Sequence, residues 1–241
     1  MWNPCDFRNY RAIYLGKEIG MNTPIMRYTS LRTLKQIMHG KLYVRKRKCY
    51  VDPHEKGKYV ERAFACPFEF MSRLNQAERT TKELESENLD KNIEKSYNTL
   101  TSCWTYSHGE KQKMWDDGEG RDILIKSTVG QLLAAINTTD FDTIVCDKMR
   151  YQTREVPKVS LHDFIFIKEG SEFEVEEELR FYFFSSKEIE EDTYFLPLSN
   201  KGLFFNSIVT RKLSGEKLSQ KEQLIKDYPI LSNYFTKSSL Y

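Results

Sequence analysis

The spacing of apolar residues changes several times along the chain, and each change marks the start of an expected element. Residues 26–30 have the composition of a short strand, and Ser30 is a residue type that often caps a helix. Apolar side chains then recur at helical spacing on one face, at Leu31, Leu34, Ile37 and Met38. Gly40 is well placed to end this helix, and residues 41–44 form the next expected strand.

Short apolar runs between polar segments predict further strands in the rest of the chain. These strands are expected at 100–106, 122–126, 143–146, 148–153, 178–184 and 204–209. Ser127 or Thr128 should start a second helix, and a third should run from 219 to 235 with an interruption at Pro229. Strands and helices mix without regular alternation. We therefore expect the α+β class, with a single mixed or antiparallel sheet as the core and flanking helices.

The chain is expected to consist of a short extension and one large domain. Residues 1–24 have mixed polarity and no clear period, which indicates an N-terminal extension. Residues 25–241 should form a single domain, since no linker or internal repeat divides them. Within this domain, residues 72–99 are rich in Glu, Lys and Asn with few apolar positions, which indicates a charged helical insertion.

One stretch, residues 173–184, begins with a crowd of carboxylates and ends as an aromatic strand. Side chains alternate between the two faces of a strand. One face would carry the polar residues Glu176, Glu178, Arg180 and Tyr182. The other face would carry Leu179, Phe181 and Phe183 toward a core. This pattern fits a solvated acidic turn in which Arg180 neutralises Glu178, and it also fits a functional site.

Composition limits the classes of function that the chain can have. Its 241 residues are 30% charged and 13% aromatic, which is typical of a globular domain. The formal net charge of +2 excludes a global polycation for nucleic acid. One local excess of positive charge is made by Arg45, Lys46, Arg47 and Lys48. This run could draw in a nucleic acid or the phosphates of a dinucleotide, or it could be an edge strand that resists aggregation.

The sequence also bears on the environment of the protein. No window approaches about 18 consecutive apolar residues, so we expect no membrane span. The N-terminus lacks a basic region followed by an apolar one and is not a secretory signal. The five cysteines have wide, irregular spacings without a C-x-x-C pair, which argues against a structural zinc site. We therefore expect reduced cysteines, a cytoplasmic location and no bound metal.

A series of short motifs, taken in order, resembles a known family. The motifs are Arg27-Tyr28-Thr29-Ser30-Leu31, Gly40-Lys41-Leu42-Tyr43, Asp52-Pro53-His54-Glu55, Cys103-Trp104, Met114-Trp115, 123–128, 173–180 and Lys237-Ser238-Ser239-Leu240. On these residues the chain is similar to the bacterial and phage domain of unknown function 2971, over residues 25–241. It departs from the family's pattern in a shortened turn at 116–120, a more basic strand at 45–48, and Val175 where a histidine is common.

The opening of the domain also resembles the ADP-ribosyltransferases, in which an arginine or histidine ending a first strand is followed by a helix, a glycine and a second strand. Those enzymes carry a Glu-x-Glu motif on a later strand, and Glu176-Glu177-Glu178 would occupy that position. The resemblance implies NAD as the substrate. Glu178 would bind the ribose 2′-hydroxyl and balance the positive charge that develops on the sugar. Glu176 would orient or deprotonate the acceptor.

The same resemblance implies a set of residues that hold NAD. Arg27 would bind the pyrophosphate or the nicotinamide ribose, because a guanidinium suits phosphate geometry. Tyr28 or Tyr43 would pack on the nicotinamide ring. Thr29 and Ser30 would hydrogen-bond to the ribose, although Ser30 equally suits a plain helix cap.

Three functions stay open on the sequence alone. The first is an ADP-ribosyltransferase-like enzyme that modifies a protein or nucleic acid, as a toxin or a phage–host conflict factor, with Glu178 and Arg27 facing one cleft. The second is a non-catalytic module for nucleotide sensing or partner binding, which predicts the same cleft without turnover and with Glu178 tied to Arg180. The third is a nuclease that holds a divalent ion with acidic residues, namely Asp52, Glu55, Glu176 and Glu178.

Overall fold

The computed structural model describes most of the chain outside a long central segment. The described residues are 3–4, 12–49, 99–107, 109–116, 120–136, 141, 143–152, 166–169, 171–185, 189–199 and 204–240. The expected insertion at 72–99 lies outside them, apart from its last residue, and so do Asp52 and Glu55.

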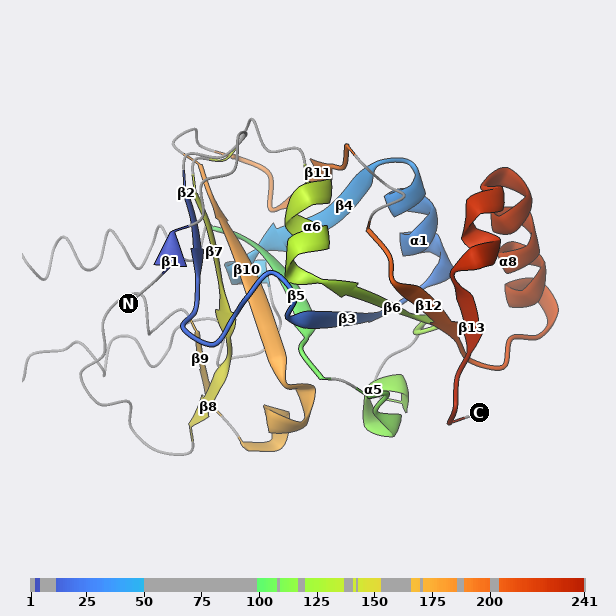
Figure 1. Ribbon diagram of the computed structural model, residues 1–241, viewed down its shortest axis with the longest axis horizontal. Helices are drawn as coiled ribbons and strands as arrows, with labels where there is room; N and C mark the ends of the chain where they lie inside the picture. The colour runs from blue at the N-terminus through green and yellow to red at the C-terminus, as the bar shows by residue number, and fades with distance from the viewer. Residues whose placement is uncertain are drawn as a thin grey trace, which may run out of the picture.

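The described residues form strands, α-helices and short 3-10 helices (Figure 1). The strands are β1 (Asn3–Pro4), β2 (Ala12–Leu15), β3 (Pro24–Thr29), β4 (Lys41–Lys46), β5 (Leu100–Thr105), β6 (Ile123–Thr128), β7 (Thr143–Lys148), β8 (Arg150–Gln152), β9 (Ile167–Glu169), β10 (Glu178–Phe184), β11 (Thr193–Pro197), β12 (Ser207–Thr210) and β13 (Phe235–Lys237). The α-helices are α1 (Leu31–Met38), α5 (Gln112–Asp116), α6 (Val129–Ala135) and α8 (Gly215–Asp227). The 3-10 helices are η1 (Arg47–Cys49), η2 (Ser171–Glu176) and η4 (Pro229–Asn233).

Eleven of the described strands join one mixed sheet. Nine of them follow the order β1-β2-β7-β10-β5-β3-β6-β12-β13, and β4 branches from β5 and pairs with β11. Most neighbours are antiparallel, whereas β2 with β7 and β12 with β13 are parallel. β8 and β9 form a separate pair. The predicted α+β class and the mixed sheet are confirmed.

The segment 1–24, which was expected to be an extension, contributes to this sheet. Strand β2 pairs in parallel with β7, from Ala12 opposite Thr143 to Leu15 opposite Cys146. Ile13 and Leu15 are buried in the main core. Part of the expected extension therefore belongs to the folded domain.

The main hydrophobic core lies on one face of the sheet, where α1 and α6 pack. The apolar face predicted for α1 is buried there, at Leu31, Leu34, Ile37 and Met38. Strand β10 contributes Leu179, Phe181 and Phe183 to the same core, as its alternation predicted. Trp104 is buried here as well, and Trp115 is buried in a small second cluster with Met26, Leu124 and Val209.

Local signals in the sequence set the ends of the two helices on this face. The Ser30 Oγ accepts a hydrogen bond from the Thr33 N–H at 3.1 Å, and Gly40 ends the segment after α1 with φ of 77°. Thr128 caps α6 in a reciprocal capping box with Gln131. These caps confirm the predicted helix starts at both positions.

Helix α8 stands at one end of the molecule beside β12 and β13, and β1 and β2 lie toward the opposite end (Figure 1). This helix begins earlier than the predicted 219 and ends just before Pro229, where η4 follows. None of the helices in the described ranges is long and apolar enough to cross a bilayer.

Candidate functional site

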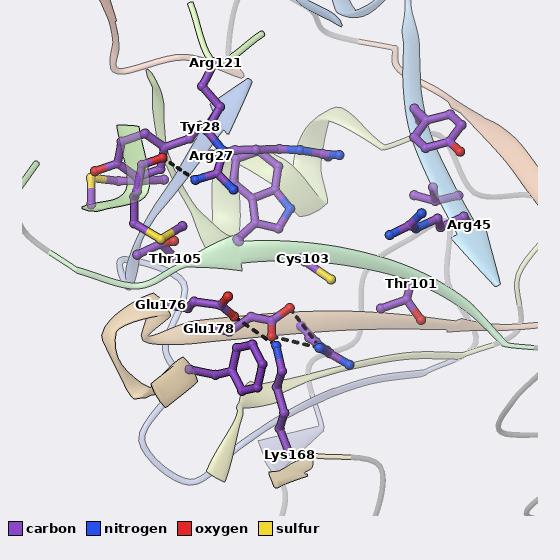
Figure 2. Close-up of a pocket in the computed structure, with 17 residues that line it drawn as sticks. Arg27, Tyr28, Arg45, Thr101, Cys103, Thr105, Arg121, Lys168, Glu176 and Glu178 are labelled. Carbon is purple, nitrogen blue, oxygen red and sulfur yellow. Dashed lines mark hydrogen bonds and ion pairs between the residues drawn. The ribbon is translucent and has the colours of Figure 1, made fainter. Parts of the chain in front are cut away.

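The sheet forks along one edge of β5. Strand β4 pairs with the first part of β5, at Arg45 opposite Thr101. Strand β3 meets β5 only at its end, at Met26 opposite Thr105. Strands β3 and β4 therefore diverge along β5, and a pocket of about 570 Å³ opens at this fork (Figure 2).

Side chains from both faces of the sheet line this fork pocket. Met26, Thr105 and Glu178 lie opposite one another in register, so they share one face. Arg27 is the next residue along β3 and faces the other way. It reaches the pocket through the fork, where its guanidinium lies 5.7 Å from the ring centre of Trp104. Figure 2 shows Arg27 and Glu178 on opposite sides of β5, both lining one cavity, as the enzyme hypothesis and the non-catalytic hypothesis both expect.

The charge that lines the fork pocket is mainly positive. Five cationic side chains contribute, from Arg27, Arg45, Arg121, Lys168 and Arg180. Two carboxylates accompany them, from Glu176 and Glu178. Aromatic side chains complete the walls, from Tyr28, Tyr43, Trp104 and Phe173. This mixture suits an anionic ligand that also carries hydroxyl groups and a flat ring.

Glu178 and Arg180 form a buried, two-pronged ion pair. The Arg180 Nε donates to Oε1 of Glu178 and Nη2 donates to Oε2, both at 2.8 Å. The two residues are 7% and 1% exposed, respectively. This contact holds the carboxylate at the pocket wall, and it is the arrangement that the non-catalytic hypothesis expected. A carboxylate has about four lone-pair positions, so acceptor capacity is left for a ligand hydroxyl.

Glu176 lies in the fork pocket but does not belong to the strand. Residues 171–176 form η2, and β10 starts at Glu178, after Glu177 turns the backbone with φ of 41°. The prediction that Glu176 continues the polar face of β10 is therefore wrong. Its Oε2 accepts from the Nζ of Lys168 at 3.1 Å. Burial raises the pKa of the Glu176 carboxyl, against the opposing effect of the Lys168 charge.

Lys168 holds Glu176 in place from the neighbouring strand β9. Its Nζ lies 3.9 Å from the ring centre of Phe173, and the residue is 8% exposed. A buried ammonium is costly unless it is paired, so the carboxylate and the ring together stabilise it. Glu176 is thereby held by a single ion pair of 3.1 Å, whereas two bonds of 2.8 Å hold Glu178.

The other residues predicted to hold NAD fall into two groups. Tyr28 and Tyr43 line the fork pocket. The Tyr28 hydroxyl accepts from the Lys111 N–H at 2.7 Å, and its ring lies perpendicular to that of Trp115 with the ring centres 5.0 Å apart. Thr29 and Ser30 are not among the lining residues of the fork pocket, and the Ser30 side chain caps α1. The prediction that Thr29 and Ser30 contact the ribose therefore does not fit the fork pocket.

The basic run from Arg45 to Lys48 does not form an exposed patch. Lys46 and Arg47 are 5% and 1% exposed. The Lys46 Nζ donates to the Glu190 carbonyl oxygen at 2.9 Å, and Lys48 pairs with Asp192 at 2.9 Å. Burial thus withdraws Lys46 and Arg47 from any nucleic acid, whereas Arg45 lines the fork pocket.

Several lining residues were not predicted as site residues. Arg121 precedes β6, and its Nη1 donates to the Met114 carbonyl oxygen. Cys103 lies opposite Arg180 in register, and its sulfur faces the same cavity (Figure 2). Lys168 follows the apolar pair Phe166-Ile167, and a lysine at the end of an apolar run does not by itself mark a site. No local signal pointed to Arg121 either.

Neither a metal-binding cluster among the described residues nor a known relative identifies the ligand of the site. In the part of the chain that the structure describes, no group of three or more His, Cys, Asp or Glu side chains could hold a metal ion. Comparison of the chain with family models, with curated proteins and with solved structures found no match. The geometry and charge of the fork pocket are therefore the features that bear on function.

Proposed function

We propose that the fork pocket binds NAD or a related nucleotide, and that the chain transfers the ADP-ribosyl group to a protein or a nucleic acid. The observation that carries this proposal is the cavity that joins Arg27 to Glu176 and Glu178. The resemblance of the domain opening and of Glu176-Glu177-Glu178 to the ADP-ribosyltransferases supports the same function. Such an activity suits a toxin or a phage–host conflict factor that acts in the cytoplasm.

The cations of the pocket suit the pyrophosphate of such a ligand. Arg27 and Arg45 come from the two strands that diverge at the fork, and Arg121 comes from the segment before β6. Guanidinium groups on several sides can each contact a different phosphate oxygen. The volume of about 570 Å³ is within the range of cofactor pockets, and Tyr43 offers a ring to a base or to nicotinamide.

The two carboxylates have different tasks in this proposal. The bond between the ribose carbon and nicotinamide breaks, and nicotinamide leaves as a neutral molecule with the bonding electrons. Glu178, fixed by Arg180, accepts a hydrogen bond from a ribose hydroxyl and orients the sugar. The acceptor forms a new bond to the same carbon, and its proton passes to Glu176. The raised pKa of Glu176 favours that proton transfer.

A second candidate is a module that binds the nucleotide without turnover. The ion pair between Glu178 and Arg180 favours it, because the pair neutralises the charge that would stabilise the sugar cation. The two candidates share the ligand and differ in whether nicotinamide is released. Binding and turnover must therefore be measured separately.

The test combines calorimetric binding of NAD with nicotinamide release and label transfer from adenine-labelled NAD in the presence of cell lysate. We expect wild type to bind and to turn over NAD. Glu176→Gln should keep binding and lose about 10²-fold to 10⁴-fold in turnover, as removal of a general base does. Arg27→Met should weaken binding. Lys212→Gln, which changes an exposed lysine, serves as the matched control.

Alkylation of Cys103 gives an independent measure of occupancy. Its half-buried thiol faces the cavity, so bound NAD should slow its reaction with iodoacetamide, followed by peptide mass spectrometry. Binding with protection of Cys103 but no nicotinamide release would assign the non-catalytic module. A folded protein that neither binds NAD nor shows protection would overturn the proposal.

A further inference from the structure

A second hollow, of about 380 Å³, lies where α1 leads into β4. Its lining residues are Arg32, Lys35, Gln36, His39, Lys41 and Phe195. Those from α1 recur at the spacing of one outward helical face, opposite the face that enters the core. The hollow is therefore a surface feature whose charged side chains meet solvent.

Strand β4 connects this hollow to the fork pocket. Lys41, Tyr43 and Arg45 alternate with buried residues and share one face of the strand. Lys41 lines the hollow, whereas Tyr43 and Arg45 line the fork pocket. The three positions span about 13 Å at the rise of a strand, a length that can contact more than one nucleotide.

Aromatic rings lie between the cations along this path. Phe195, on β11 opposite Tyr43, is 43% exposed although it is a large apolar side chain. The ring centres of Phe195 and Tyr43 are 5.7 Å apart, and the Lys41 Nζ lies 6.0 Å from the ring centre of Phe195. We call Arg32, Lys35, Lys41, Tyr43, Arg45 and Phe195 the basic–aromatic stripe.

The cations at the outer end of the stripe are available to a ligand. Arg32, Lys35 and Lys41 are exposed. Within the described ranges, no carboxylate lies at ion-pair distance from any of them, in contrast to Lys48 with its partner Asp192. A run of cations without acidic neighbours attracts a polyanion.

We propose that the basic–aromatic stripe binds single-stranded nucleic acid and leads it to the fork pocket. The cations match the backbone phosphates, and the exposed rings match unstacked bases, which a duplex does not offer. An acidic peptide would use the charges but leave Phe195 without a partner. Delivery of the strand as the acceptor rests on the proposed ADP-ribosyl transfer, whereas binding of the strand does not.

The experiment measures fluorescence anisotropy of labelled single-stranded DNA and RNA of about 12 nucleotides, without NAD, at several salt concentrations. Unlabelled duplex of the same sequence and polyglutamate serve as competitors. Lys35→Gln/Lys41→Gln should weaken binding. It should also reduce the slope of the logarithm of the association constant against the logarithm of salt concentration by about 1.4, since two phosphate contacts are lost and each contributes about 0.7. Phe195→Leu should weaken binding about ten-fold through lost stacking and leave the slope unchanged. Lys212→Gln/Lys226→Gln removes the same charge from exposed positions and should have little effect.

The possible outcomes separate this proposal from the proposed function. Binding of the single strand, with the effects above, supports the stripe even if NAD is never turned over. Label transfer from NAD to the bound oligonucleotide would in addition support its role as the acceptor. Absence of binding, preference for duplex or polyglutamate, or equal weakening by the control variant would overturn the proposal.

Discussion

Replacing Arg180 with methionine should strongly destabilise the fold, because the change leaves the Glu178 carboxylate buried without its partner. Arg180 is 1% exposed and donates two hydrogen bonds of 2.8 Å to Glu178. Breaking a buried ion pair from one side costs about 3–5 kcal/mol. For a chain of this size each kcal/mol corresponds to roughly 2–4 °C, so the midpoint of thermal unfolding should fall by about 6–20 °C.

The double variant Glu178→Gln/Arg180→Met should recover much of this loss. It removes both charges together, and buried ion pairs replaced by neutral side chains of similar volume are often no less stable. The two single variants and the double variant form a cycle that isolates the coupling between the residues. We expect a coupling free energy of about 2 kcal/mol or more, within the range for directly bonded pairs.

Urea unfolding, followed by tryptophan fluorescence and circular dichroism, measures these free energies. Lys226→Met is the control, since Lys226 is exposed on α8 and its replacement should change stability by less than about 0.5 kcal/mol. The reasoning is refuted if Arg180→Met matches the control, or if the double variant is no more stable than the less stable single variant. The double variant is also the proper reference when Glu178→Gln is tested for turnover.

Two further predictions follow from side chains near the fork pocket and at α1. Since burial raises the pKa of Glu176 above its ordinary value of 4.5, its contribution to stability is complete below that value and is lost as pH rises through the raised pKa. The stability of wild type relative to Glu176→Gln, from urea unfolding at each pH, should therefore fall as the pH rises above 4.5; a constant or rising difference would contradict this. Ser30→Ala should cost about 1 kcal/mol of unfolding free energy through loss of the α1 cap, whereas Ser30→Asp should retain it; equal loss in both variants would contradict a capping role.

The sequence best predicted those helices and strands that are marked by residues within or next to them. Ser30, the apolar spacing of α1 and Gly40 marked that helix from its own residues, and the structure confirms it. The alternation along 178–184 likewise placed Glu178 and Arg180 on one face, away from the core. These features depend on neighbours within a few positions, which a sequence displays directly.

Features that depend on distant partners escaped prediction. Burial of Lys46 requires Glu190 and Asp192, which approach only when β11 pairs with β4. Strand β2 is short, and its pairing with β7 shows no local pattern. Glu176 was assigned to the wrong element because nothing nearby showed that Glu177 would turn the backbone. The fork itself arises from pairing between separate strands, so Arg121 and Lys168 could not be joined to the site in advance.

The fork also determines how this chain can be divided. One wing of the fork is β3-β6-β12-β13, and the other is β4-β11, and both wings join the same edge of β5. Along the sequence the strands alternate between the two wings, with β3, β6 and β12 separated by strands of the other wing. Neither wing is a contiguous piece of polypeptide. A single crossover or truncation therefore cannot exchange one wall of the pocket as a unit. A new ligand specificity must come from substitutions at the residues that already line the pocket.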